Sequence, residues 1–206
     1  LTFYRYAHSL GLAYGVTAFD IDSAKMLYGV GVDFIKIASA CVTDTVLLDH
    51  CAGLQGPAMV VSTGTGTQHD VDLAVETITK RGCPFALPQC TAIYPLPDPS
   101  LLNLRVIDTY RQCYPHVVTG LSSHFPLGWD AVLAYALGGR VFEKHVTLDR
   151  AARGADHKFS LTPVMMRSLV DRLEQARVAL GTGIKERLPE EAEAVRKMGH
   201  SLVAAR

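Results

Sequence analysis

Two histidines close two strand-like segments in the middle of the chain. His124 follows the run 120–123, and His145 ends the run 141–145, 21 residues further on. This interval is long enough for one helix between two parallel strands, and parallel strands would bring both imidazoles to one end of a sheet. Two imidazoles with Glu143 close by could hold a divalent metal ion that keeps open coordination positions. The alternative for each histidine is a hydrogen-bonded residue of the core.

A lysine lies inside another apolar segment. Lys36 belongs to the run 34–38, where a charged side chain is unfavourable unless an anionic group meets it. A bound phosphate or carboxylate would meet that need, and Thr17 and Ser39 could add hydroxyl groups to form an anion pocket. Two alternatives stay open for Lys36, which are a structural ion pair with a neighbouring acid and a Schiff-base amine. Asp156 follows the last strand and either caps a turn or binds hydroxyl groups above the site.

The elements that position these residues follow from the hydrophobic pattern. Apolar residues at 3.6-residue spacing predict a helix around 71–78, capped by Asp70 and ended by Gly82, and another over 166–180. Short apolar runs predict strands at 13–18, 34–38, 58–62, 85–89, 117–121 and 141–145. The alternation indicates an α/β fold with a parallel sheet and helices outside.

The spacing of the strands favours a particular α/β architecture. Intervals of about 20 to 32 residues are typical of the (β/α)8 TIM barrel, whose active site lies at the carboxyl ends of its strands. Six strands are predicted instead of eight. Either two units are missing from the N-terminal side or the sheet is open. Of these we expect the first, a TIM barrel that lacks its first two βα units.

Composition excludes several classes of function. The 206 residues are 49% hydrophobic, their formal net charge is zero, and no long basic run occurs, which argues against a nucleic-acid partner. No apolar run approaches the roughly 20 residues that cross a bilayer, and no signal peptide is recognisable, so we expect no membrane partner. The five cysteines form no Cys-x-x-Cys pair, which indicates a reduced, cytoplasmic protein.

Several short motifs occur in a fixed order along nearly the whole chain, and together they carry a resemblance. They are Gly15–Asp20, Lys36–Ser39, Ser62–Gly64, Gln89–Thr91, Tyr94-Pro95, Asn103–Arg105, Ser122–His124, Glu143–His145, Thr147–Asp149 and Gly154–Ser160. In these motifs the chain resembles the sialic acid synthase (NeuB-like) family. A set of motifs in one order is far more specific than any single member of it.

The resemblance implies a reaction. Members of this family condense phosphoenolpyruvate with an N-acylated amino sugar, such as N-acetylmannosamine or its 6-phosphate, to a nine-carbon 2-keto acid. Carbon 3 of phosphoenolpyruvate attacks the sugar aldehyde, water adds at carbon 2, and phosphate leaves by C–O cleavage. A divalent ion, Mn2+ or Mg2+, polarises the aldehyde. The resemblance also implies a cytoplasmic homodimer.

The resemblance assigns roles to individual residues. It implies that His124 and His145 hold the metal ion, and that Glu143 and Asp156 face the sugar and the metal. It places five further residues around phosphoenolpyruvate, and we expect Lys36 and Tyr94 among these, together with Glu143, to be catalytic. The five are Thr17, Lys36, Ser39, Tyr94 and Ser122.

The chain also departs from the family pattern. Ser123 stands where the family has Asp beside the metal histidine, Ala92 replaces a residue that contacts phosphoenolpyruvate, and Ala18 replaces Pro. We expect residues 1–186 to be a partial TIM-barrel synthase domain. Residues 187–206 are expected to form a terminal helix and a linker, at 200–203, towards an antifreeze-like domain that has no counterpart here.

Two other functions stay open. The chain could be a truncated, non-catalytic barrel remnant that binds ligand weakly or assembles with a partner. It could also be a metal-dependent aldolase on the same barrel, which would not need the anion pocket at Lys36. The sequence leaves undecided which nine-carbon acid would be formed and whether the sugar carries a 6-phosphate.

Overall fold

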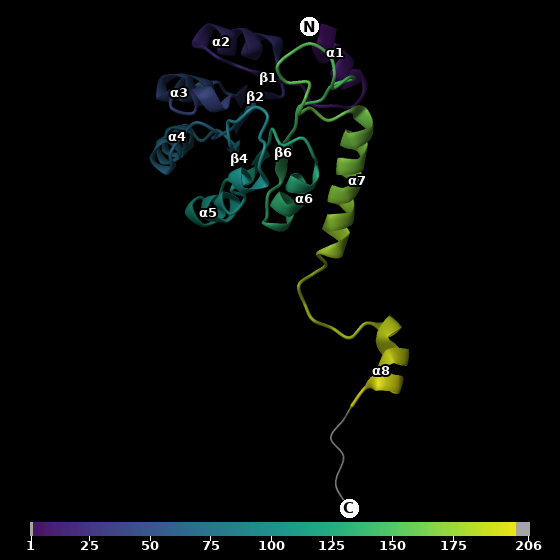
Figure 1. Ribbon diagram of the computed structural model, residues 1–206. Helices are drawn as coiled ribbons and strands as arrows, with labels where there is room; N and C mark the ends of the chain where they lie inside the picture. Colours follow the sequence, from purple (N-terminus) through teal and green to yellow (C-terminus); the bar gives the residue numbers. More distant parts are fainter. Residues whose placement is uncertain (1, 201–206) are drawn as a thin grey trace, which may run out of the picture.

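The computed structural model describes residues 2–200, and within them six strands form one sheet. All neighbouring strands are parallel, and their spatial order follows the chain order (Figure 1). The six predicted strands are confirmed, although most are shorter than predicted. They are β1 (Gly15–Thr17), β2 (Phe34–Ile37), β3 (Ala58–Val61), β4 (Phe85–Cys90), β5 (Val118–Ser122) and β6 (Val141–Glu143).

A helix follows each strand and covers the outer side of the sheet (Figure 1). One helix before β1, α1 (Thr2–Ser9), was not predicted. The others are α2 (Ile21–Val30), α3 (Thr45–Gly53), α4 (Gln68–Lys80), α5 (Val106–Cys113), α6 (Trp129–Ala136), α7 (Pro163–Ala179) and α8 (Ala192–Met198), with 3-10 turns at Ser39–Cys41, Pro99–Leu102 and Pro189–Glu191.

Side-chain caps fix where several helices begin. Asp20 accepts a hydrogen bond from the Ser23 amide at the start of α2, which satisfies an amide that the helix cannot pair. The prediction that Asp70 caps α4 is wrong by three residues. Thr67 is the cap, and the Asp70 carboxylate bonds back to the Thr67 amide in a capping box. The predicted end is close, since α4 stops at Lys80 and Gly82 adopts a positive φ of 67° just beyond it.

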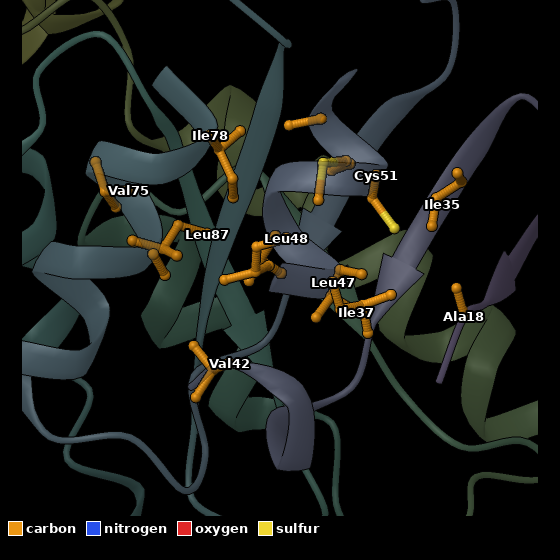
Figure 2. Packing of buried hydrophobic residues seen from close by; sticks show 14 of the residues in the cluster. Ala18, Ile35, Ile37, Val42, Leu47, Leu48, Cys51, Val75, Ile78 and Leu87 are labelled. Atoms are coloured by element: carbon orange, nitrogen blue, oxygen red, sulfur yellow. The ribbon is translucent and has the colours of Figure 1, made fainter. Parts of the chain in front are cut away.

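The core lies between the outer face of the sheet and the helices. Ile35 and Ile37 of β2 are fully buried against α3, where Leu47 and Leu48 meet them (Figure 2). Side chains alternate along a strand, so the residues between them face the other side. Those residues, such as Lys36, are only partly buried. The strands were expected to be buried on both faces. This holds for most of β4 and β5, whereas β1, β2, β3 and β6 are more open on the inner face.

The sheet curls into a half-barrel, so that β2 and β6 face each other across its inner side. Lys36 Nζ of β2 lies 3.4 Å from Glu143 Oε2 of β6, although three strands separate them in the sheet. The inner side holds a cavity of about 380 Å3, lined by residues of β1, β2, β3 and β6, by Lys144 just after β6 and by Met166 of α7. The expected α/β barrel architecture is therefore present as six parallel strands.

The C-terminal part differs from its prediction in detail. Of the apolar residues predicted on one face of α7, Leu169 is buried, whereas Val170 is about half-exposed and Leu180 lies beyond the helix end. Helix α8 has no buried residue and lies away from the half-barrel at the end of an extended segment (Figure 1). It matches the predicted terminal helix, but residues 201–203 of the predicted linker lie outside the described residues.

No helix within residues 2–200 combines the length and the apolar character that crossing a bilayer requires.

Helix α3 offers a test of where the core lies. Leu48 is 0% exposed, whereas Val46 on the same helix is 67% exposed. We expect Leu48→Ala to lower the free energy of unfolding by about 2–5 kcal/mol, because it removes buried contacts and leaves a cavity. Val46→Ala should change it by about 0.5 kcal/mol or less. Urea unfolding of both variants checks this, and equal effects would contradict the burial of α3.

Candidate active site

The two histidines predicted to lie together do so at the carboxyl ends of β5 and β6. The ring centroids of His124 and His145 are 5.2 Å apart. Phe159 packs edge-on against both rings, at 5.6 and 5.0 Å, and the Tyr94 ring lies 4.1 Å from that of His124. Phe159 is almost fully buried, so the imidazoles are held against a fixed apolar wall.

One ring nitrogen of each histidine is already engaged. His124 Nδ1 lies 3.3 Å from the Thr91 carbonyl oxygen, and His145 Nδ1 lies 3.4 Å from Asp156 Oδ2. A protonated Nδ1 that donates to an oxygen leaves Nε2 unprotonated in the neutral ring. Histidines that bind metal ions usually have this kind of partner, since it fixes the tautomer and the ring orientation. The hydrogen bond of His124 and the Asp156 carboxylate near His145 fit a pair of imidazoles that could bind a divalent metal ion through Nε2.

The protonation of His124 also suits a metal ligand. Burial lowers the pKa of the His124 imidazole below its ordinary value, and the contact with the Thr91 carbonyl only partly opposes this. At neutral pH the ring is therefore neutral, which is the form that binds a metal ion.

The two imidazoles would fill only part of a coordination shell. Within residues 2–200, no three side chains of His, Cys, Asp or Glu come together in a way that could hold a metal ion. Water or substrate oxygens would have to complete the shell. A site of this kind is typical of a catalytic metal ion, whereas a structural zinc site is closed by protein ligands.

Lys36 and Glu143 meet inside the half-barrel. The Lys36 amine also donates to the Ile37 carbonyl at 2.7 Å, and Ser62 Oγ donates to Glu143 Oε2 at 3.1 Å. The structural ion pair that the sequence left open is therefore present. Lys36 nevertheless lines the inner cavity together with Thr17, as an anion pocket requires. Burial lowers the pKa of the Lys36 amine, and the nearby Glu143 carboxylate opposes that effect.

Ser39 and Ser122 lie at the carboxyl ends of β2 and β5, and both contact Cys90. Both serines are buried, and their hydroxyl groups partly offset the rise that burial causes in the pKa of the Cys90 thiol. Ser39 Oγ also accepts a hydrogen bond from the Gly64 amide at 3.0 Å. A Cβ at Gly64 would lie 2.6 Å from Ser39 Oγ, so only glycine permits this close approach. Ser39 thus holds the Gly- and Thr-rich loop after β3.

The other predicted residues form two groups. Thr17, Lys36 and Glu143 line the inner cavity. Tyr94, Asp156 and the two histidines gather at the carboxyl end of the sheet, which we call the mouth. Burial raises the pKa of the Tyr94 phenol, so this half-exposed side chain is a hydrogen-bond donor at neutral pH. The structure brings Asp156 to His145, and its predicted contact with substrate stays a prediction.

Sequence reasoning missed a buried ionic group beside the histidines. Lys144 Nζ lies 2.6 Å from Asp130 Oδ2 of α6, and Ser123 Oγ also donates to this carboxylate. A signal was present, because Asp130 is an isolated charge in an apolar helix. Phe159 was missed as well, since a phenylalanine in a loop carries no chemical signal.

The fold and the site together define the class of protein. Parallel strands curled around a polar cavity, with functional side chains at their carboxyl ends, are typical of α/β-barrel enzymes. The pattern of the NeuB family matches residues 2–185, and the chain belongs to this family. The predicted resemblance is confirmed.

Named relatives agree with this membership. The chain is 33% identical over 200 residues to human N-acetylneuraminate-9-phosphate synthase, covering 97% of this chain and 55% of that protein. It is 31% identical over 202 residues to N,N'-diacetyllegionaminic acid synthase of Campylobacter jejuni, covering 97% of this chain and 60% of that one. The chain thus spans little more than half the length of these relatives.

A solved structure shares the fold. It is the N-acetylneuraminic acid synthetase of Leptospira borgpetersenii in complex with citrate, with a TM-score of 0.85 and 30% identity. The match covers 95% of this chain and 68% of that one.

The pairing of Lys36 with Glu143 can be tested by titration. Glu143→Gln removes a negative charge but keeps an oxygen that accepts from Ser62. Without that charge the neutral amine is favoured, so we expect the pKa of Lys36 to fall further below its ordinary value. Lysine side-chain NMR shifts followed against pH measure this. Glu76→Gln, which removes an exposed partner of Lys80, is the control and should leave Lys36 unchanged. A constant Lys36 pKa in Glu143→Gln would contradict the pairing.

Proposed function

We propose that this chain is the larger part of the catalytic barrel of a sialic-acid-type synthase. The enzyme condenses phosphoenolpyruvate with an N-acylated amino sugar, N-acetylmannosamine or its 6-phosphate, and releases phosphate. The observation that carries the proposal is the juxtaposition of Lys36, facing the inner cavity, with the imidazole pair at its mouth. An anion receptor and a metal site at one end of one barrel match the two substrates of this reaction. The named relatives support the reaction class.

The residues of the cavity would bind phosphoenolpyruvate. The Lys36 ammonium and the Thr17 hydroxyl receive its anionic groups, and Ser39 and Ser122, which meet at Cys90, add hydroxyl groups at the carboxyl ends of their strands. This places carbon 3 towards the mouth, where the sugar aldehyde lies. Carbon 3 attacks the aldehyde carbon, water adds at carbon 2, and the C–O bond to phosphate breaks. Glu143 is positioned by Ser62 and Lys36 to accept the proton of that water.

The residues of the mouth would bind the sugar. His124 and His145 hold Mn2+ or Mg2+, which when bound would polarise the aldehyde carbonyl. Asp156 orients His145 and is close enough to the mouth to meet sugar hydroxyl groups. Tyr94 packs on His124 and presents its hydroxyl as a donor at this edge.

The rest of the enzyme belongs to the same proposal. The inner cavity is bounded by β1 and β6, which do not pair with each other, and two further βα units between them would complete a (β/α)8 barrel. The full-length enzyme would be a cytoplasmic homodimer with an antifreeze-like domain after the barrel.

The direct test is phosphate release from phosphoenolpyruvate by the full-length protein. N-acetylmannosamine and its 6-phosphate are supplied separately, each with and without Mn2+. Release that needs both a sugar and the metal ion supports the synthase and identifies its acceptor. If no phosphate is released with either sugar from folded full-length protein, the result would favour a different acceptor or a barrel that is not catalytic.

The metal assignment predicts the effect of removing either imidazole. His124→Ala and His145→Ala should each abolish metal-dependent phosphate release and leave the circular dichroism spectrum unchanged, because both side chains lie at the edge of the core. His69→Ala, on the exposed surface of α4, is the matched control and should retain full activity. Full activity in His124→Ala or His145→Ala would contradict the assignment of that histidine as a metal ligand.

The anion pocket predicts a separate kinetic effect. Lys36→Ala should raise the KM for phosphoenolpyruvate by about 10- to 100-fold, the equivalent of a charged hydrogen bond of about 1.5–3 kcal/mol. The KM for the sugar should change much less. Lys25→Ala, at an exposed lysine of α2, is the control. An unchanged KM for phosphoenolpyruvate in Lys36→Ala would contradict the pocket.

A further inference from the structure

A buried ion pair lies directly behind the imidazole pair. Lys144 Nζ is 2.6 Å from Asp130 Oδ2, and the two side chains are 3% and 0% exposed. The same amine donates to Ser123 Oγ and to the carbonyl oxygens of Phe125 and Leu127, at 3.1, 3.1 and 3.2 Å. One ammonium group thus connects α6, the end of β5 and the loop between them.

The connected residues are the immediate neighbours of the two histidines. Ser123 precedes His124, and Lys144 precedes His145. The Ser123 amide also donates to the Glu143 carbonyl at 3.2 Å, so the two segments remain paired beyond the last residues of the strands. Because side chains alternate along extended backbone, Ser123 and Lys144 point towards α6 while the imidazoles point to the inner side. Contacts that hold Ser123 and Lys144 against α6 therefore fix the direction in which the imidazoles of His124 and His145 point.

Stability alone does not account for these buried charges. Apolar residues of similar volume can replace a buried ion pair with little loss of stability, because removing two charges from water is costly. Asp130 Oδ1 is buried without a hydrogen-bond partner in the part of the chain that the structure describes, which adds to that cost. What the pair supplies, and apolar packing does not, is directed bonds to residues on either side of His124, namely to the Ser123 hydroxyl before it and to the Phe125 and Leu127 carbonyls after it.

We propose that Asp130 is a positioning residue, which acts through Lys144 to hold the segments of His124 and His145 at the separation that metal binding requires. The inference rests on the metal site of the proposed function. Asp130 touches neither substrate nor metal ion in this arrangement. Ser123 stands where the family pattern has Asp, and its Oγ already lies within hydrogen-bond distance of Lys144. A carboxylate at position 123 could therefore take over the task of Asp130.

The test is Mn2+ binding by the full-length protein, titrated with MnCl2 alone and without phosphoenolpyruvate or sugar. Asp130→Ser should weaken the affinity about tenfold, the lower end of the range for outer partners of metal ligands. The exchange Ser123→Asp with Asp130→Ser should restore it, because the carboxylate again meets Lys144. If Asp130→Ser does not fold, the apolar pair Asp130→Leu with Lys144→Met, which leaves no buried charge, should show the same weakening.

Two controls separate this inference from the function on which it rests. Asp72→Asn removes a carboxylate of α4 that accepts from Gln68 and Tyr114, and it should leave the Mn2+ affinity unchanged. His124→Ala should abolish binding. If His124→Ala abolishes binding and the Asp130 variants bind as the unmodified protein does, the positioning role is overturned and the metal site stands. If His124→Ala binds normally, the metal site is wrong and the inference falls with it.

Discussion

The arrangement of the inner face depends on one requirement, which is that the partly buried lysine of β2, Lys36, must have an anionic partner. Lys36 faces inward from β2, where burial disfavours its charge, and within residues 2–200 it is β6 that brings a carboxylate to it. That contact exists because the parallel sheet curls by the right-handed twist of its strands. The contact in turn places Glu143 beside Ser62. It also fixes the segment after β6, where His145 follows Glu143 by two residues. The ion pair of Lys36 with Glu143 thus links the curvature of the sheet to the position of the cavity and of its mouth.

The alternation of side chains along the strands gives the same segments two functions. On β2, Ile35 and Ile37 build the core with α3, while Lys36 between them faces the cavity. After β6, Lys144 enters a buried ionic group with α6, while His145 faces the mouth. The outer face therefore supplies rigidity and the inner face supplies chemistry. A shift of one residue in the pairing of a strand would move its core residues to the inner face and its site residues to the outer face. This strict register is what allows short strands of three to six residues to hold a precise site.

Local patterns allowed the strands, the parallel sheet and the meeting of His124 with His145 to be predicted from the sequence. Apolar runs and one intervening helix were sufficient for these. Partners that come from distant strands could not be predicted, because the curvature of the sheet has no local signal. Lys36 could therefore be assigned an anion but not Glu143, which is 107 residues away. Asp130 carried a local signal as an isolated charge in an apolar helix, but nothing in the sequence identified Lys144 as its partner. The cap of α4 was misplaced since Thr67 and Asp70 both suit a helix start, and only the backbone distinguishes the cap from the third residue.

The ion pair inside the cavity also bears on how the proposed reaction would proceed. In the free protein Lys36 is committed to Glu143, so an incoming anion must share or replace that carboxylate as the partner of the amine. Replacement is favourable where the new anion carries more charge than a carboxylate, as a phosphate ester does. It would also release Glu143 from Lys36 while Ser62 still orients it. Binding of the first substrate would thus prepare the group that accepts a proton later, and a neutral ligand of the same shape would leave the pair closed.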